Sequence, residues 1–216
     1  MDGAAFVAQL KRENERLLGK LDQEPAAAGR DAATLGALLK IALKNEMEAA
    51  EIAAAWVATT PELEAKLALA QHAGDEARHF QLLAEKAQSL GVDLEGYDPL
   101  QPASPVLEFL RSLPTTVERV AAALVTREAM GGRRNAQFLK LLESMGQGEL
   151  ARLYRDVINP DEERHHQAGC ALLARLAVTP EAQERARRAA ARLLEIGDRA
   201  RETLLAKTGA ACIPGC

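Results

Sequence analysis

The sequence predicts an all-α fold from its composition and from the placement of its helix-capping residues. Ala, Leu, Glu, Arg and Gln dominate the 216 residues, and all of these are strong helix formers. Aromatic residues make up only 3% of the chain and β-branched residues are sparse, which argues against a sheet. The length fits one domain with appendages and is sufficient to bury a substantial core.

Capping and breaking signals divide the chain into successive helices. Asp31 or Thr34 caps one long helix, Thr60 followed by Pro61 starts the next, and Gly91 ends it. The proline-rich segment that follows predicts a long connection with a short helix inside it. The predicted helices span residues 2–21, 31–59, 60–90, 105–112, 114–145, 148–177 and 180–207.

Two long helices, a long connection, two more long helices and a final helix form the order typical of a four-helix bundle with one crossover. We expect the bundle to occupy residues 31–177, with a leading helix and linker over 1–30 and an extra helix and tail over 178–216. Pro160 interrupts the last helix of the bundle. It predicts either a tolerated kink or a distortion that aims the neighbouring Glu162.

Charge and cysteine content argue against several classes of protein. The net charge of −4 and the lack of a basic face make nucleic acid an unexpected partner. No run of 18 apolar residues predicts a membrane span, and the N-terminus lacks the pattern of a secretory signal. Three cysteines fit a reducing cytoplasm. Cys170 is expected in the core, whereas Cys212 and Cys216 are expected to be tail thiols, with a redox pair as the alternative.

Two five-residue segments nearly repeat, and each ends in one of the four histidines of the chain. Residues 75–79 and 161–165 both read Asp-Glu-x-Arg-His. Glu and His three positions apart project from one face of a helix, and together these two side chains suit iron or manganese. The alternative register, Glu163 with His166, does not reproduce the Asp and Arg positions.

A di-iron bundle also needs one inward glutamate from each of the other two helices. Glu46 falls on the apolar face of its helix, whereas Glu48 and Glu51 fall on the polar side with Lys44. Glu128 lies on the apolar line of the third long helix. A buried carboxylate without a partner is costly, so these positions predict a metal. The predicted metal ligands are Glu46, Glu76, His79, Glu128, Glu162 and His165.

This arrangement resembles the carboxylate-bridged di-iron proteins of the ferritin-like superfamily over about residues 35–177. The motifs and their spacing look most like the bacterial multicomponent monooxygenases and the small subunit of ribonucleotide reductase. The resemblance implies two iron ions, with manganese or a mixed pair as the alternative. It implies bridging by Glu76 and Glu162 and two pairs of terminal ligands, Glu46 with His79 and Glu128 with His165.

The resemblance also assigns supporting roles to the other motif residues. Asp75 and Asp161 would accept hydrogen bonds from the imidazole N–H groups and so orient the rings. Arg78 and Arg164 would pair with nearby carboxylates. His72, four residues before Glu76, is expected to be a partly buried spectator, with an extra ligand or a hydrogen-bonding group as the alternative.

The chain departs from these relatives in three respects. It is too short for a monooxygenase hydroxylase subunit, and Leu83 stands where the reductase carries its radical tyrosine. Gly131 and Gly132 stand one turn after Glu128, where the monooxygenases place a hydroxyl residue. The two glycines either leave room beside the metals or let two helices pack closely.

We therefore expect an O2-activating di-iron oxidase or oxygenase that hydroxylates or N-oxygenates a small organic substrate. Its expected partners are the substrate, O2 and an electron-donor protein, and a homodimer is compatible with this function. The expected pocket lining consists of small residues: Ala49, Ala50, Ala53, Gly131 and Gly132. The alternatives are a ferroxidase or iron-handling protein like the ferritins, and a non-enzymatic helical protein with a structural metal site.

Overall fold

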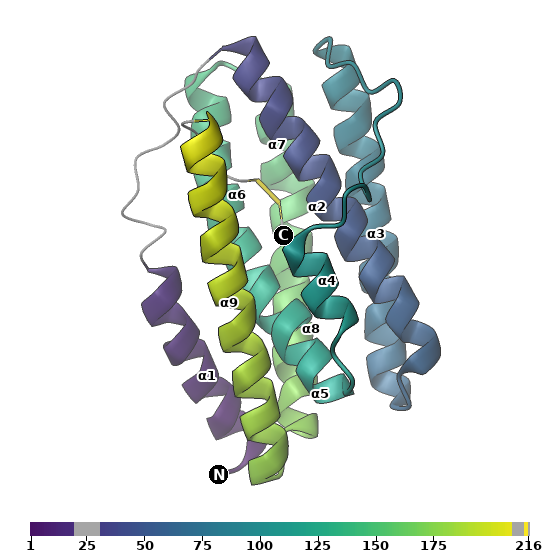
Figure 1. Ribbon diagram of the computed structural model, residues 1–216, viewed down its shortest axis with the longest axis vertical. Coiled ribbons are helices and arrows are strands. Elements are labelled where there is room, and N and C mark those ends of the chain that lie inside the picture. Colours follow the sequence, from purple (N-terminus) through teal and green to yellow (C-terminus); the bar gives the residue numbers. More distant parts are fainter. Residues whose placement is uncertain (20–30, 209–213, 216) are drawn as a thin grey trace.

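The computed structural model describes residues 1–19, 31–208, 214 and 215, and every regular element within these ranges is helical (Figure 1). The predicted all-α class is therefore confirmed. The elements are α1 Gly3–Leu18, α2 Ala32–Thr59, α3 Leu63–Ser89, α4 Pro105–Arg111, α5 Thr116–Arg119, η2 Val120–Arg127, α6 Glu128–Ser144, α7 Gly148–Leu153, η3 Tyr154–Ile158, α8 Asn159–Leu176 and α9 Pro180–Thr208. None of the described helices combines the length and apolar character needed to cross a membrane.

The helix ends follow the capping signals with one exception. The Asp31 side chain accepts a hydrogen bond from the Thr34 amide at 2.7 Å and caps α2. Gly91 ends α3 with a φ of +80°, a conformation that glycine adopts without strain. The predicted start of α3 at Thr60 and Pro61 is wrong, because the helix begins at Leu63. The Thr60 hydroxyl is buried and faces another helix instead of capping α3.

Both helices of the second pair contain a π-helical segment directly before a predicted ligand. η2 ends at Arg127, next to Glu128, and η3 ends at Ile158, shortly before Glu162. Pro160 is the second residue of α8, which continues directly from η3, so the helix passes through this proline with a π-helical segment on its N-terminal side. π-Helical turns are frequent at functional sites because the extra residue re-aims the side chains that follow.

The core contains two large apolar clusters, separated along the helices by polar positions, and a small third cluster of Leu18, Met130 and Leu194. Leu69 of α3 belongs to one cluster and Leu83 of the same helix belongs to the other. α2 and α3 pack along their length, and α8 packs on η2, α6 and α3. α1 and α9 lie side by side on one flank and add Phe6 and Leu193 to the first cluster (Figure 1). The terminal helices thus share a core with the central segment.

Candidate metal centre

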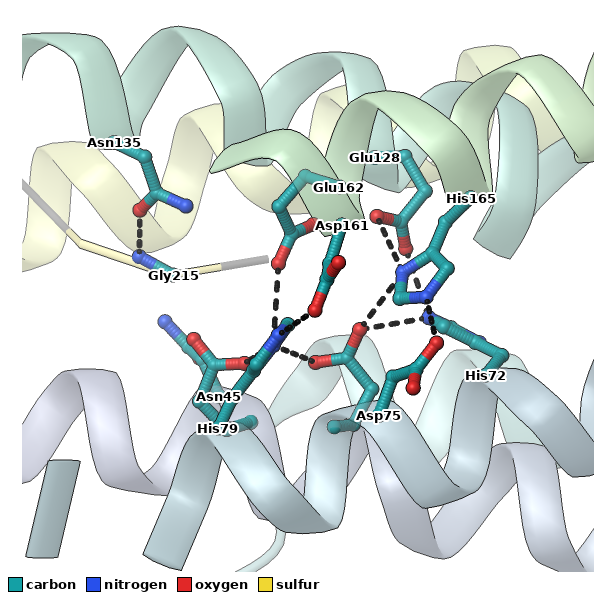
Figure 2. A network of polar contacts seen from close by, with 12 residues as sticks. Asn45, His72, Asp75, His79, Glu128, Asn135, Asp161, Glu162, His165 and Gly215 are labelled. Carbon is teal, nitrogen blue, oxygen red and sulfur yellow. Dashed lines mark hydrogen bonds and ion pairs between the residues drawn. The ribbon is translucent and has the colours of Figure 1, made fainter. Parts of the chain in front are cut away.

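The predicted metal ligands lie in one buried polar layer between the two apolar clusters (Figure 2). None of the six residues exposes more than 5% of its surface. Four helices supply them: α2 carries Glu46, α3 carries Glu76 and His79, α6 begins with Glu128, and α8 carries Glu162 and His165. Segments that are far apart in the sequence therefore bring all six side chains together.

The carboxylates and imidazoles form two groups of four, and within each group the ligand atoms lie within 4.8 Å of one another. Glu76 belongs to both groups, so its two oxygens can face two neighbouring ions. Each group contains at least one histidine and two carboxylates, a donor set that suits divalent transition metals. One group is Glu46, Glu76, His79 and Glu162, and the other is His72, Glu76, Glu128 and His165.

His72 belongs to the second group, and its expected partial burial is wrong. The residue is only 2% exposed. Its Nε2 atom lies 3.0 Å from Glu76 Oε1 and 3.1 Å from Glu128 Oε1. The sequence signal was its position one helical turn before Glu76, but spacing alone could not show how deeply this turn is buried.

The Nδ1 atoms of the two motif histidines point toward the carboxylates. His79 Nδ1 lies 3.4 Å from Glu46 Oε2 and 3.6 Å from Glu76 Oε2. His165 Nδ1 lies 3.2 Å from Glu76 Oε1 and 3.9 Å from Glu128 Oε2. His79 is thus nearest to Glu46, whereas His165 is nearer to Glu76 than to Glu128.

The aspartates of the two motifs hold the histidines in a crossed arrangement. His79 Nε2 lies 3.1 Å from Asp161 Oδ2, and His165 Nε2 lies 3.0 Å from Asp75 Oδ2 (Figure 2). Each aspartate therefore contacts the imidazole of the opposite helix, which ties α3 to α8. With its Nε2 atom so engaged, each ring is oriented with Nδ1 available for a metal.

The two motif arginines differ in their ion pairs, although they occupy equivalent positions in the repeated motif. Arg164 pairs with Asp161 and also reaches Asp75 at 3.1 Å, so it joins both aspartates. Arg78 is exposed and makes no ion pair with the residues that the structure describes. The expected pairing of Arg78 with a carboxylate is therefore absent from this part of the chain. A single arginine therefore contacts both aspartates.

Several buried ligand atoms lack a hydrogen-bond partner, and this is the observation that tests the fit of a metal. Both oxygens of Glu46, both oxygens of Glu76 and the Nδ1 atoms of His79 and His165 are buried without one. Buried polar atoms without partners are rare and costly in proteins. Coordination to metal ions would engage all of these lone pairs, so the residues present fit the predicted metal.

Burial and mutual charge shift the protonation of the site. Burial raises the pKa of Glu46, and repulsion from Glu76 raises it further, to about 8. Burial opposes the charged form of His72, but the charge of Glu128 raises its pKa to about 10. Burial also opposes the charged form of His79, but the neighbouring carboxylates of Glu46 and Glu76 raise its pKa to about 11. A metal ion must therefore displace protons when it binds.

A pocket of about 660 Å³ reaches the site between α1, α6 and α8. Glu128 and Glu162 form part of its wall. Gly132 also lines it, and a Cβ atom at Gly132 would have no other heavy atom within 4 Å, so here the glycine leaves space. The rest of the expected lining is wrong: Gly131 and the three alanines of α2 are buried and do not line this pocket.

The alternative register and Cys170 lie outside the polar layer. Glu163 is exposed, and His166 places its Nδ1 atom 2.9 Å from the Val125 carbonyl oxygen. The Sγ atom of Cys170 is 3.6 Å from His166, and burial raises the pKa of this thiol. The remaining two cysteines, at positions 212 and 216, lie outside the described residues.

No protein-family model, curated protein or solved structure matches this chain. The chemical interpretation therefore rests on the donor set and its geometry. The described residues offer two adjoining positions for metal ions, deep in the core, with an adjacent pocket that reaches two of the ligands.

Proposed function

We propose that this protein is an O2-activating di-iron oxidase or oxygenase of the ferritin-like type that acts on a small organic substrate. The observation that carries the proposal is the shared position of Glu76 between two buried groups of nitrogen and oxygen donors. Carboxylates and imidazoles in this proportion are the ligands of the di-iron helical bundles. The helix order, with a long connection between the second and third long helices, supports the same assignment.

In this proposal the two groups hold one ion each. Glu46, His79 and Glu162 would bind the first ion, and His72, Glu128 and His165 the second. Glu76 would join the two, whereas Glu162, the other bridge implied by the resemblance, belongs to the first group alone. Two ferrous ions, when bound, supply two electrons to O2 together. Manganese in one or both positions is the alternative.

The protein's own contribution is orientation and exclusion of water. Asp75 and Asp161 hold the imidazole rings in position, and the two apolar clusters keep bulk water away from the ligands. An electron-donor protein would return the metals to the ferrous state after each turnover.

The pocket favours an organic substrate over iron storage. Its volume falls within the range of about 300–1,000 Å³ that is typical of small-molecule sites. It ends at Glu128 and Glu162, so a bound molecule would lie beside the metals. Charged side chains of both signs line it, including Lys11, Lys140 and Glu15, which suits a substrate with a polar group.

Metal analysis of purified variants tests the proposal. We expect two iron ions per wild-type chain and a large loss of iron in Glu76→Ala and His165→Ala. Glu163→Ala is the matched control, because Glu163 is an exposed glutamate beside Glu162 and should retain wild-type iron. Wild-type iron content in both ligand variants would refute the site.

A second measurement separates an oxygenase from the alternatives. The reduced iron-loaded protein is mixed with O2 in the presence and absence of candidate substrates, and its size is measured in solution. An oxygenase consumes O2 with substrate and reductant as a monomer or small oligomer. A very large particle that oxidises many irons per chain would instead establish a ferritin-like iron store, and a metal-loaded protein inert to O2 would establish a structural site.

A further inference from the structure

Two residues near the C-terminus, Pro214 and Gly215, lie beside the metal centre. Pro214 and Gly215 are buried, and Gly215 lies between α2 and α6 at the end of the site opposite His72 (Figure 2). Neither residue lines the pocket that reaches Glu128. Pro214 and Gly215 therefore lie at a different side of the metal centre from this pocket.

Two asparagines hold a single peptide unit of the tail. Asn45 Nδ2 donates a hydrogen bond to the Pro214 carbonyl oxygen at 2.8 Å. The Gly215 N–H donates to Asn135 Oδ1, also at 2.8 Å. The carbonyl and the N–H belong to the same peptide unit, so the two side chains satisfy both of its hydrogen-bonding groups. Asn135 is fully buried, and Gly215 is the hydrogen-bond donor that the described residues provide for its Oδ1 atom.

Glycine is required at position 215 for two independent reasons. Its φ is +91°, in the region that side chains strongly disfavour. A Cβ atom would also lie 2.9 Å from Asn45 Cβ and 3.5 Å from Glu46 Oε1. The second distance shows that the tail backbone reaches the carboxylate of a predicted metal ligand. That carboxylate oxygen is one of the buried atoms without a hydrogen-bond partner.

A further hydrogen bond connects Asn45 to the helix segment that carries Glu128. Arg127, which is buried at the end of η2, donates from Nη2 to the Asn45 carbonyl oxygen at 2.9 Å. Asn45 directly precedes Glu46, and Arg127 directly precedes Glu128. Asn45, which binds Pro214, is thus held by a hydrogen bond to the residue that precedes Glu128, and it directly precedes Glu46.

We propose that Asn45 and Asn135 form a binding site for one peptide unit, that the chain's own Pro214 and Gly215 fill it, and that the seated tail closes the Glu46 side of the metal centre. Access to the metals then runs through the pocket beside Glu128 and Glu162. The closure depends on the proposed metal centre but not on its oxygen chemistry. The peptide-binding site depends on neither, so it can be tested without metal.

The test without metal is hydrogen exchange of the Gly215 amide in the full chain. The buried N–H should exchange far more slowly than a free peptide amide, and Asn135→Ala should remove most of this protection. Exchange at the rate of an unstructured peptide in the wild-type protein would overturn the peptide-binding site, whatever the protein does with iron.

The test with metal is the rate at which an excess of a ferrous chelator removes iron. Gly215→Val displaces the tail without changing any residue of the helices, and a chain that ends at Thr208 lacks the tail altogether. We expect both to release iron about tenfold faster or more, because two buried hydrogen bonds no longer hold the closed form. Gly96→Val is the matched control: Gly96 also has a positive φ, of +66°, but a Cβ atom there meets nothing within 4 Å.

Two further arms make the assignment specific. Asn135→Ala should not accelerate iron release further in the chain that ends at Thr208, because its partner is already gone. A synthetic peptide of residues 206–216, added to that chain, should slow iron release again. Equal release rates in the wild type, Gly215→Val and the truncated chain would overturn the closure, and an additive Asn135→Ala effect would show that Asn135 acts on the bundle instead.

Discussion

Replacing Glu46 by glutamine should stabilise the metal-free protein at neutral pH, although it removes a metal ligand. Burial and the charge of Glu76 raise the pKa of Glu46 from 4.5 to about 8. Between these two values the folded protein keeps a proton that the unfolded chain releases, so its stability falls as the pH rises through this window. Glutamine has nearly the same shape and carries no proton to release. The substitution therefore removes this loss of stability.

The size of the effect follows from the same two pKa values. At pH 7 the wild type has lost stability over the interval from 4.5 to 7, at about 1.4 kcal/mol per pH unit, or about 3 kcal/mol in all. At pH 5 the same calculation gives a loss of stability of less than about 1 kcal/mol. The gain from Glu46→Gln should therefore be large at pH 7 and small at pH 5.

Glu48 provides a matched control on the same helix. It is as deeply buried as Glu46, but Lys44 Nζ lies 2.8 Å from its Oε1 atom and the Ser104 amide donates to it at 2.9 Å. Glu48→Gln weakens these charge-assisted contacts and should destabilise the protein by about 1–3 kcal/mol. Two buried glutamates two residues apart should thus respond to the same substitution with opposite signs.

Urea denaturation in the presence of a strong chelator measures both variants at pH 5 and pH 7. A Glu46→Gln protein that is no more stable than the wild type at pH 7 would refute the reasoning. So would a gain of equal size at both pH values, because it would not arise from a proton. In the metal-loaded protein the order should reverse, since the lost ligand weakens metal binding.

Three other properties can be predicted. Asp161→Asn should weaken metal binding about 10- to 100-fold in a competition titration, because His79 loses its orienting carboxylate; unchanged affinity would contradict the crossed arrangement. Gly169→Ala should cost about 1–3 kcal/mol in denaturation, since its Cβ would lie 2.5 Å from a side chain of η2, whereas Gly132→Ala should cost nothing. Metal binding at pH 7 should release protons from His72 and His79, whose pKa values are about 10 and 11, so metal affinity should rise with pH. A pH indicator in weak buffer records the proton release, and metal binding without proton release would contradict both pKa values.

The helices and the six proposed ligands were accessible from the sequence because they depend on local rules. Helix-forming residues, an N-cap at Asp31 and a stop at Gly91 act within a turn or two of their own position. A Glu and a His three residues apart share a face in any helix, so the repeated motif is visible without a structure. The error at the start of α3 arose where a distant contact, between Arg119 and Thr60, overrides the local capping preference.

The pocket and the two arginines could not be predicted because they depend on which helix lies opposite. Alanines on α2 resemble a pocket lining in sequence, but neighbouring helices fill the space beside them. Arg78 and Arg164 occupy equivalent motif positions, yet only Arg164 faces both aspartates. Side chains with identical local patterns acquire different partners when the helices pack.

By itself the sequence determined the all-α class, the helix order and six of the glutamates and histidines that face inward, since periodicity and capping are properties of a single segment. Only the tertiary structure decided that His72 joins the second group and that each aspartate contacts the histidine of the other motif. It alone decided that the tail seats a peptide unit between Asn45 and Asn135. The contacts of the aspartates and of Gly215 join residues 80 or more positions apart, and their geometry depends on how whole helices pack rather than on any local pattern.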